Sequence, residues 1–368
     1  MSRRILLLIT DLQIGGTPTV VRELAIRLNR AGLHVEVACL SSGGPVSQQL
    51  NDAGVTTHAL DARGPRDLPR TVGRLVRLVR DGGGLKPTLQ ASFDTVFSFL
   101  VHANVTAALA SLRLRDVRFI QSVQTTQPEP AWHWKVQRFA ARRTQTVVVP
   151  SPSVARVAGV RSHIPPAKFV VIPNAVDTQI FQPIIRSASS DTSRHRIGFL
   201  GRLDPVKQVD QLLRTMCELD PRYELHIFGD GAERENLQRL TLGLHLSSRV
   251  TFHGTVASPV DALRAIDLLV LPSQAEGFGL VLIEAMAAGV PVVGTDVDGI
   301  RDVIQHEHNG ILARSASTED LTRAIHALTG DDEASAVLRR RVVEGGLKTV
   351  QEKYTWDAVV GEYLKVLA

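Results

Sequence analysis

The sequence predicts an α/β protein made of two doubly wound parallel-sheet domains. Short aliphatic runs alternate with helical segments along the chain, and the alternation restarts near residue 196. Apolar residues make up 44% of the chain and aromatic residues 5%, which suits aliphatic strands buried on both faces. The length of 368 residues allows two domains that each have their own core.

In the first half, aliphatic strands alternate with helices that end at glycines. The expected strands are residues 5–9, 35–40, 95–98, 117–122, 146–149 and 169–172. The expected helices are residues 20–29, residues 68–80 with Gly82-Gly83-Gly84 at their end, and a helix that follows His102. Residues 183–195 are rich first in proline and then in serine, threonine and arginine, so they are the expected linker.

The second half repeats the same pattern. Its expected strands are residues 196–201, 224–229, 249–253, 267–271 and 291–294, and its last helix covers about 356–366. We expect domains at residues 1–178 and 179–352, with 353–368 as a C-terminal helix. Residues 1–178 hold 22 Lys and Arg against 11 Asp and Glu, a net +11, whereas residues 179–368 carry −6. This asymmetry supports a boundary between the halves.

Cysteine content and hydrophobicity restrict the class of protein. Cys39 and Cys217 are the two cysteines, so the chain has neither a disulfide framework nor a zinc cluster, and we expect a reducing, cytoplasmic setting. Arg3 and Arg4 precede an apolar run that ends too early for a signal peptide. No run reaches the roughly 18 to 20 apolar residues of a membrane span. We therefore expect a soluble protein or one bound peripherally at the inner face of the membrane.

Two glutamates border a glycine-containing loop at the start of a predicted helix. Glu276 follows the apolar run 268–272, and Glu284 lies within the apolar segment that follows. A separation of about two helical turns, roughly 12 Å, would let them hold two hydroxyl-bearing parts of one elongated ligand, such as the sugar and the ribose of a nucleotide sugar. It is too large for a glycosidase acid and base that act on one bond.

A basic pair follows the first strand of the second half. Arg202 and Lys207 lie in the segment Gly-Arg-Leu-Asp-Pro-Val-Lys, which precedes a helix. A guanidinium offers paired donors, an ammonium offers a point charge, and a helix N-terminus adds free N–H groups. This combination is typical of a site for a diphosphate.

The spacing of Glu276 and Glu284 resembles the Glu-x7-Glu signature of retaining glycosyltransferases. The stretch 272–293, with its Gly-Phe-Gly and its Pro-Val-Val strand, resembles family 4 of those enzymes. The resemblance implies the GT-B architecture, in which two Rossmann-like domains face each other across a cleft and the last helix returns to the first domain. It also implies transfer of a hexose from a nucleotide sugar in the assembly of a glycan, polysaccharide or glycolipid.

The resemblance assigns roles to residues of the second domain. It implies that Arg202 and Lys207 neutralise the departing diphosphate, although Gln208 stands where relatives often have glycine. Glu284 would bind the ribose, and Glu276 would bind the transferred sugar. Five further donor contacts are expected at backbone groups of this domain: Gly229, Phe278, Gly279, Leu280 and, for the nucleobase, Val256.

In the first domain, the resemblance points to a glycine loop and a histidine. Gly16 belongs to the Gly-Gly loop that approaches the donor phosphates, and Thr17-Pro18-Thr19 departs from the family pattern after it. His102, in a His-Ala-Asn context, resembles the active-site histidine that binds the transferred sugar. We expect four catalytic residues: His102, Arg202, Lys207 and Glu276.

The expected partners are a UDP- or GDP-sugar and a glycan or lipid-linked acceptor. No Asp-x-Asp motif ends a strand, so neither a metal nor another cofactor is expected. The basic helical face of Arg66, Arg70, Arg74 and Arg77 is either a solvated face or a contact with an anionic membrane. Trp132 and Trp134, near further arginines, support the membrane alternative. A nucleic acid is not expected, because no recognition motif accompanies the charge.

Two alternatives remain open at this point. A nucleotide-sugar epimerase could use the same architecture, although no cluster of carboxylates and histidines for elimination is evident. A catalytically degenerate sugar-nucleotide-binding protein is the alternative without enzymatic activity. The sequence does not determine the base, the sugar or the acceptor.

Overall fold

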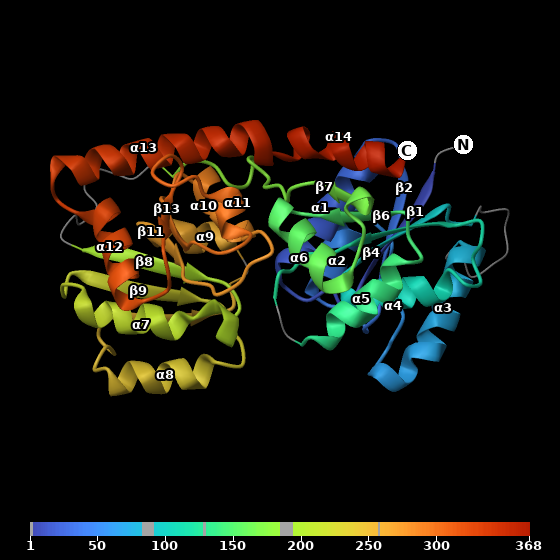
Figure 1. The fold of residues 1–368 in the computed structure, drawn as a ribbon, viewed down its shortest axis with the longest axis horizontal. Helices are drawn as coiled ribbons and strands as arrows, with labels where there is room; N and C mark the ends of the chain where they lie inside the picture. The colour runs from blue at the N-terminus through green and yellow to red at the C-terminus, as the bar shows by residue number, and fades with distance from the viewer. Residues whose placement is uncertain (1–2, 83–91, 128–129, 185–193, 257) are drawn as a thin grey trace. The chain divides into compact units, whose positions relative to one another are not determined.

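The protein consists of two compact α/β units. The computed structural model describes residues 3–82, 92–127, 130–184, 194–256 and 258–368. The first unit comprises Met1–Asn174 together with Val359–Ala368, and the second comprises Ala175–Ala358. The two sheets and their surrounding helices are labelled in Figure 1.

The first unit is built on a seven-stranded parallel sheet with the order β3-β2-β1-β4-β5-β6-β7. Its strands are β1 (Arg4–Ile9), β2 (His34–Cys39), β3 (Thr57–Ala59), β4 (Thr95–Phe99), β5 (Arg118–Ser122), β6 (Thr146–Val149) and β7 (Phe169–Val171). The side chains of Ile5 to Ile9 are fully buried. Ile5 pairs with Val35 on one side and with Thr95 on the other, so β1 is an interior strand, and the strand order reverses beside it.

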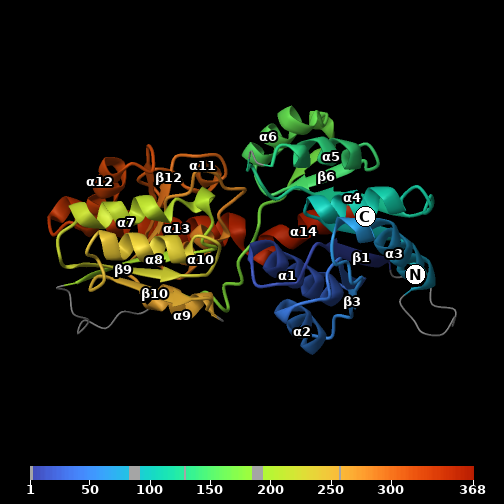
Figure 2. The same ribbon diagram turned by 90° about the horizontal axis from the view of Figure 1, so that it is seen from below.

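Helices connect consecutive strands of this sheet. They are α1 (Gly16–Arg30), α2 (Pro45–Asp52), α3 (Leu68–Asp81), α4 (Val101–Ala110), α5 (Trp132–Ala141) and α6 (Pro152–Ser162). Neighbours in the series α3, α4, α5 and α6 pack against one another, as do α1 and α2 (Figure 2). Because such crossovers are right-handed, reversal of the strand order at β1 places these two groups on opposite faces.

The second unit contains a six-stranded parallel sheet with the order β10-β9-β8-β11-β12-β13. The strands are β8 (His195–Leu200), β9 (Tyr223–Phe228), β10 (Val250–Gly254), β11 (Leu268–Leu271), β12 (Val292–Thr295) and β13 (Ile311–Ala313). The helices are α7 (Val209–Glu218), α8 (Arg234–Gly243), α9 (Pro259–Arg264), α10 (Leu280–Ala287), α11 (Ile300–Val303), α12 (Thr318–Thr329), α13 (Glu333–Thr349) and α14 (Trp356–Leu367). Helix α14 begins in this unit and ends in the first.

The predicted fold class of two parallel α/β domains is confirmed. Two strands were not predicted, β3 (Thr57–Ala59) and β13 (Ile311–Ala313), because each is three residues long and neither lies in a longer aliphatic run like the one that contains β7. Part of the predicted linker, residues 185–193, and the glycines at 83 and 84 lie outside the described residues. The chain enters the second unit at Ala175, where the Val176 N–H donates to the Tyr354 carbonyl at 2.8 Å.

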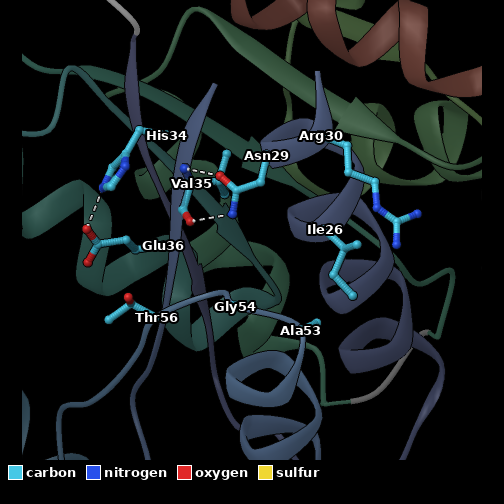
Figure 3. A pocket seen from close by; sticks show the side chains of 9 residues that line it. All are labelled: Ile26, Asn29, Arg30, His34, Val35, Glu36, Ala53, Gly54 and Thr56. Carbon is cyan, nitrogen blue, oxygen red and sulfur yellow. Dashed lines mark hydrogen bonds and ion pairs between the residues drawn. The ribbon is translucent and has the colours of Figure 1, made fainter. Parts of the chain in front are cut away.

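A buried carboxylate joins the amino ends of strands in the first unit. Glu36 is 6% exposed, and Arg4 Nη2 donates to its Oε1 at 3.1 Å. The His34 Nε2 lies 2.8 Å from Oε1 and the His58 Nε2 lies 2.6 Å from Oε2. Burial alone would raise the pKa of Glu36, but the hydrogen bonds and charges of His58 and His34 outweigh burial and lower it. Glu36 and His34 line a cavity of about 410 Å³. Figure 3 shows the side chains that line it.

We expect Glu36→Gln to destabilise the protein by about 1–3 kcal/mol at neutral pH, because the largely shielded Arg4 and His58 side chains lose a charged hydrogen-bond partner. A lowered folded-state pKa contributes stability above the unfolded value of about 4.3, and that contribution is lost as the pH falls through the folded value. The difference in Tm between wild type and Glu36→Gln should therefore shrink as the pH falls below about 4. Thermal unfolding across pH tests this, with the exposed Glu319→Gln as control. A difference that stays constant down to pH 3 would contradict it.

Candidate active site

The predicted donor residues of the second unit lie in loops at one edge of its sheet. Arg202 and Lys207 follow β8, Gly229 follows β9, Val256 follows β10 and Glu276 follows β11. These four strands are consecutive neighbours in the sheet, and all are parallel. Their carboxyl ends therefore share an edge, which is where ligands of open α/β sheets bind.

The carboxylate of Glu276 is held by two donors. The Lys207 ammonium forms an ion pair with Oε1 of Glu276, and the side chains are only 15% and 12% exposed. The Ser273 hydroxyl donates to the same oxygen at 3.1 Å. Ser273 itself is fully buried, and its carbonyl accepts a hydrogen bond from the hydroxyl of Thr295 at the end of β12. The sequence placed Glu276 and Lys207 on different parts of the ligand, whereas the structure pairs them.

Arg202 differs from Lys207 in its surroundings. Its guanidinium Nη2 lies 2.9 Å from Oδ2 of Asp204, and its side chain is 67% exposed. The short 3-10 turn Pro205–Lys207 then turns the chain so that Lys207 is largely buried. The Gln274 N–H donates to the Val206 carbonyl at 2.8 Å, which ties this turn to the loop that carries Glu276. The Arg202 guanidinium is thus exposed at the sheet edge, whereas the Lys207 ammonium is largely buried there and paired with Glu276.

Glycines let the loops of this edge touch backbone to backbone. A Cβ on Gly229, whose φ is +134°, would lie 1.9 Å from the Gly201 carbonyl oxygen. A Cβ on Gly299, with φ +84°, would lie 2.3 Å from the carbonyl oxygen of Glu276. Neither position accepts a side chain, so these contacts fix the loop backbones beside Glu276 and Arg202.

The second glutamate lies in a helix that begins later than expected. Gly279 has a φ of +78°, and helix α10 starts at Leu280, so Glu284 belongs to its second turn. The predicted spacing of two full helical turns between the glutamates is wrong, because residues 276 to 279 form a loop. Glu284 is 9% exposed, and Phe278 is buried with its ring edge to face against Tyr354. The Phe278 contribution to a ligand is therefore limited to its backbone.

In the first unit, two predicted residues begin helices at the carboxyl edge of the sheet. Gly16 opens α1, and a Cβ placed on it would meet no protein atom within 4 Å. His102 is the second residue of α4, which follows β4, and its side chain is exposed. The rings of Trp132 and His133, from the start of α5, lie near the His102 ring. The sequence analysis missed His133, because nothing in its local pattern links it to His102.

The predicted basic face comprises Arg66 in the 3-10 turn Pro65–Asp67 and three arginines of α3, and it is partly engaged in structure. Arg66, Arg70 and Arg77 are exposed, but the Arg74 guanidinium donates to the Leu60 carbonyl at 2.5 Å and is 28% exposed. Arg74 thus fastens the helix to the fold, and the exposed basic face consists of the other three arginines.

The prediction that Trp134 contributes to an interface is wrong. Trp134, expected beside Trp132 at an interface, is 6% exposed and belongs to the core.

Within the described ranges, no three His, Cys, Asp or Glu side chains converge as metal ligands, and the absence of a metal requirement stays a prediction. Among the described helices, none combines the length and the apolar character that a membrane span requires.

The geometry of the second unit favours the binding of an anion beside hydroxyl groups. An exposed guanidinium, a fixed ammonium and the N–H groups at the start of α10 all lie in adjoining loops of the sheet edge. The carboxylates of Glu276 and Glu284 are suited to accept hydrogen bonds from hydroxyls. The cavity beside Glu36 lies at the opposite ends of the strands in the first unit and lacks this combination.

Comparisons with known proteins agree with this arrangement. The family model described as Glycosyltransferase Family 4 matches residues 14–180, and the model described as Glycosyl transferases group 1 matches residues 181–345. D-inositol 3-phosphate glycosyltransferase from Stackebrandtia nassauensis is 28% identical over 95% of this chain and 86% of its own. N-acetyl-alpha-D-glucosaminyl L-malate synthase from Bacillus anthracis is 34% identical over 43% of this chain and 41% of its own.

Solved structures share the fold over nearly the whole chain. HepE from Anabaena, crystallised in complex with UDP and glucose, superposes with a TM-score of 0.86 at 20% identity, covering 99% of each chain. The two family models together account for both units of the structure. The chain is a glycosyltransferase with the GT-B fold and belongs to glycosyltransferase family 4.

Proposed function

We propose that the protein is a retaining glycosyltransferase that moves a hexose from a nucleoside-diphosphate sugar to a glycan or a lipid-linked acceptor. The observation that carries this proposal is the site around Glu276, where a largely shielded carboxylate pairs with an ammonium and an exposed guanidinium lies on the same loop as that ammonium. Departure of a nucleoside diphosphate builds negative charge on its phosphate oxygens, and preorganised cations stabilise that charge.

The Lys207 ion pair has a direct consequence for donor binding. When a diphosphate approaches, its oxygens compete with Glu276 for the Lys207 ammonium, because phosphate carries more charge than a carboxylate. Ser273 continues to hold Glu276 in place as the ammonium moves. Glu276 then accepts a hydrogen bond from a sugar hydroxyl, and Glu284 accepts from the ribose. Movement of the Lys207 ammonium from Glu276 to the diphosphate thus both stabilises the leaving group and frees Glu276 to bind the sugar.

The remaining donor contacts follow from the same edge. We assign the N–H groups of Phe278, Gly279 and Leu280 to the transferred sugar and the backbone near Val256 to the base. The open space around Gly16 suits a close approach of the donor phosphates, because no packing within the protein requires glycine there. His102 is assigned to the transferred sugar through the family resemblance. The donor is a UDP- or GDP-sugar, and the protein needs neither a metal nor another cofactor.

Two alternatives make different predictions for the same assay. A nucleotide-sugar epimerase would convert the donor into a sugar isomer without an acceptor, whereas a transferase gives at most slow hydrolysis. A degenerate binding protein would show neither reaction. Incubation of the protein with UDP- and GDP-sugars, followed by chromatography of the nucleotide products, distinguishes the three. The Lys207–Glu276 arrangement favours the transferase, because a binding protein has no need of a fixed cation for a leaving group.

Removal of Arg202 or Lys207 tests whether these cations stabilise the leaving diphosphate. Arg202→Ala and Lys207→Ala should each lower turnover by about 10² to 10³, as expected for the loss of a preorganised charge. Arg202→Ala should fold with an unchanged Tm, because the side chain is exposed. Arg314→Ala removes another exposed arginine that is paired with an aspartate, and it should leave turnover unchanged. Turnover within about threefold of wild type in both Arg202→Ala and Lys207→Ala would refute the assignment.

Diphosphate binding distinguishes the proposed roles of Glu276 and Glu284. Glu284→Ala should weaken the binding of free nucleoside diphosphate by about 1–3 kcal/mol, because the ribose hydroxyls lose their acceptor. Glu276→Ala should leave that binding unchanged or strengthen it, since Lys207 no longer pairs with a carboxylate. Isothermal titration with UDP and GDP measures both effects. Equal losses of affinity in the two variants would show that the roles are wrongly assigned.

The exposed arginines of α3 and of the 3-10 turn before it lead to a test of membrane association. If Arg66, Arg70 and Arg77 meet an anionic surface carrying a lipid-linked acceptor, the protein should sediment with phosphatidylglycerol vesicles at low salt and be released at high salt. Arg70→Gln with Arg77→Gln should weaken binding by about 1 kcal/mol per residue. Arg340→Gln with Arg341→Gln removes two exposed arginines of α13 as a matched control. Absence of vesicle binding at low salt would favour a soluble acceptor.

A further inference from the structure

Three aromatic rings gather at the carboxyl edge of the sheet in the first unit. The ring centroids of His102 and His133 lie 5.4 Å apart at an interplanar angle of 85°. Those of Trp132 and His133 lie 4.1 Å apart at 74°, and those of His102 and Trp132 lie 6.2 Å apart at 66°. Every pair meets edge to face, which is a favourable geometry for aromatic rings. The three side chains thus support one another in a defined arrangement.

The cluster lies where the topology favours a ligand. His102 is in the first turn of α4, after β4, and Trp132 and His133 are in the first turn of α5, the helix between β5 and β6. Strands β1, β4 and β5 are neighbours in the sheet, and the strand order reverses between β1 and β4. Gly16 opens α1 directly after the loop that follows β1. This reversal is the point of an open α/β sheet at which ligands bind.

Trp132 is exposed in a way that core packing does not explain. Its side chain is 51% exposed, whereas Trp134 and Trp356 are 6% and 3% exposed. Its indole ring is nevertheless held by His133 rather than left to turn freely. Burial, and next the charge of His102, lower the pKa of His133, which favours the neutral imidazole. A neutral imidazole can both donate and accept a hydrogen bond.

We propose that Trp132 and His133 form a subsite for a pyranose ring of the acceptor. A pyranose has an apolar C–H face bordered by hydroxyl groups. The indole face offers apolar area and a negative π-cloud to those C–H groups, and the neighbouring imidazole bonds the hydroxyls. An acyl chain would match the indole but would bury two imidazoles without hydrogen-bond partners, which is unfavourable. This inference rests on the proposed function and narrows its acceptor to one that carries a sugar.

Saturation-transfer NMR with methyl α-D-glucopyranoside, methyl α-D-mannopyranoside and methyl β-D-galactopyranoside tests the subsite. We expect transfer to the ring C–H protons of at least one glycoside in wild type. Trp132→Ala should weaken that binding by about tenfold, and Trp132→Tyr should largely retain it, because stacking needs an aromatic face. Phe139→Ala is the matched control, since Phe139 is 37% exposed on the same helix but lies outside the cluster. It should leave glycoside binding unchanged.

Binding of UDP and GDP is titrated on the same variants, so that failure of the donor assignment is seen separately. Unchanged diphosphate binding with a lost glycoside signal in Trp132→Ala supports the subsite. Transfer that is equal in wild type and Trp132→Ala overturns it, and so does a wild-type protein that binds none of the three glycosides. Loss of phosphatidylglycerol vesicle binding in both Trp132→Ala and Phe139→Ala, with glycoside binding intact, also overturns it and makes this face a membrane contact.

Discussion

The ion pair between Lys207 and Glu276 is the interaction on which the candidate active site depends. Two loops that follow different strands are brought together by one ammonium and one carboxylate, both largely shielded from water. Such a pair is costly to desolvate, and it persists because Ser273 supplies a further hydrogen bond and the surrounding backbone is rigid. In the proposed mechanism this cost is useful, because the pair exchanges its partners when a charged donor arrives.

Glycines contribute to the rigidity around this pair. Gly229 and Gly299 each occupy a backbone position where a Cβ would collide with a neighbouring carbonyl. The close approach fixes the loops after β9 and β12 against those that carry Arg202 and Glu276. Functional groups held by backbone contacts lose little conformational freedom on binding a ligand, which favours a preorganised electrostatic site.

The two units divide the chemistry between them. The second unit gathers charged groups that match a nucleoside diphosphate, whereas the cluster of the first unit consists of His102, Trp132 and His133. Charged groups are suited to stabilise a leaving group, and aromatic rings are suited to recognise a sugar. The basic face of α3 adds a surface property in the first unit, where the net charge of residues 1–178 is +11.

The sequence alone determined the class of fold, the family, and the loops that carry Arg202, Lys207 and Glu276. These features depend on local periodicity and on short motifs, which are readable without a structure. Only the tertiary structure decided that Lys207 pairs with Glu276, that Arg74 is engaged by Leu60, that Trp134 is buried, and that His133 lies beside His102. Each of these facts joins a side chain to a partner on another loop, strand or helix or to the core, and a local sequence pattern carries no information about which distant groups the sheet brings together.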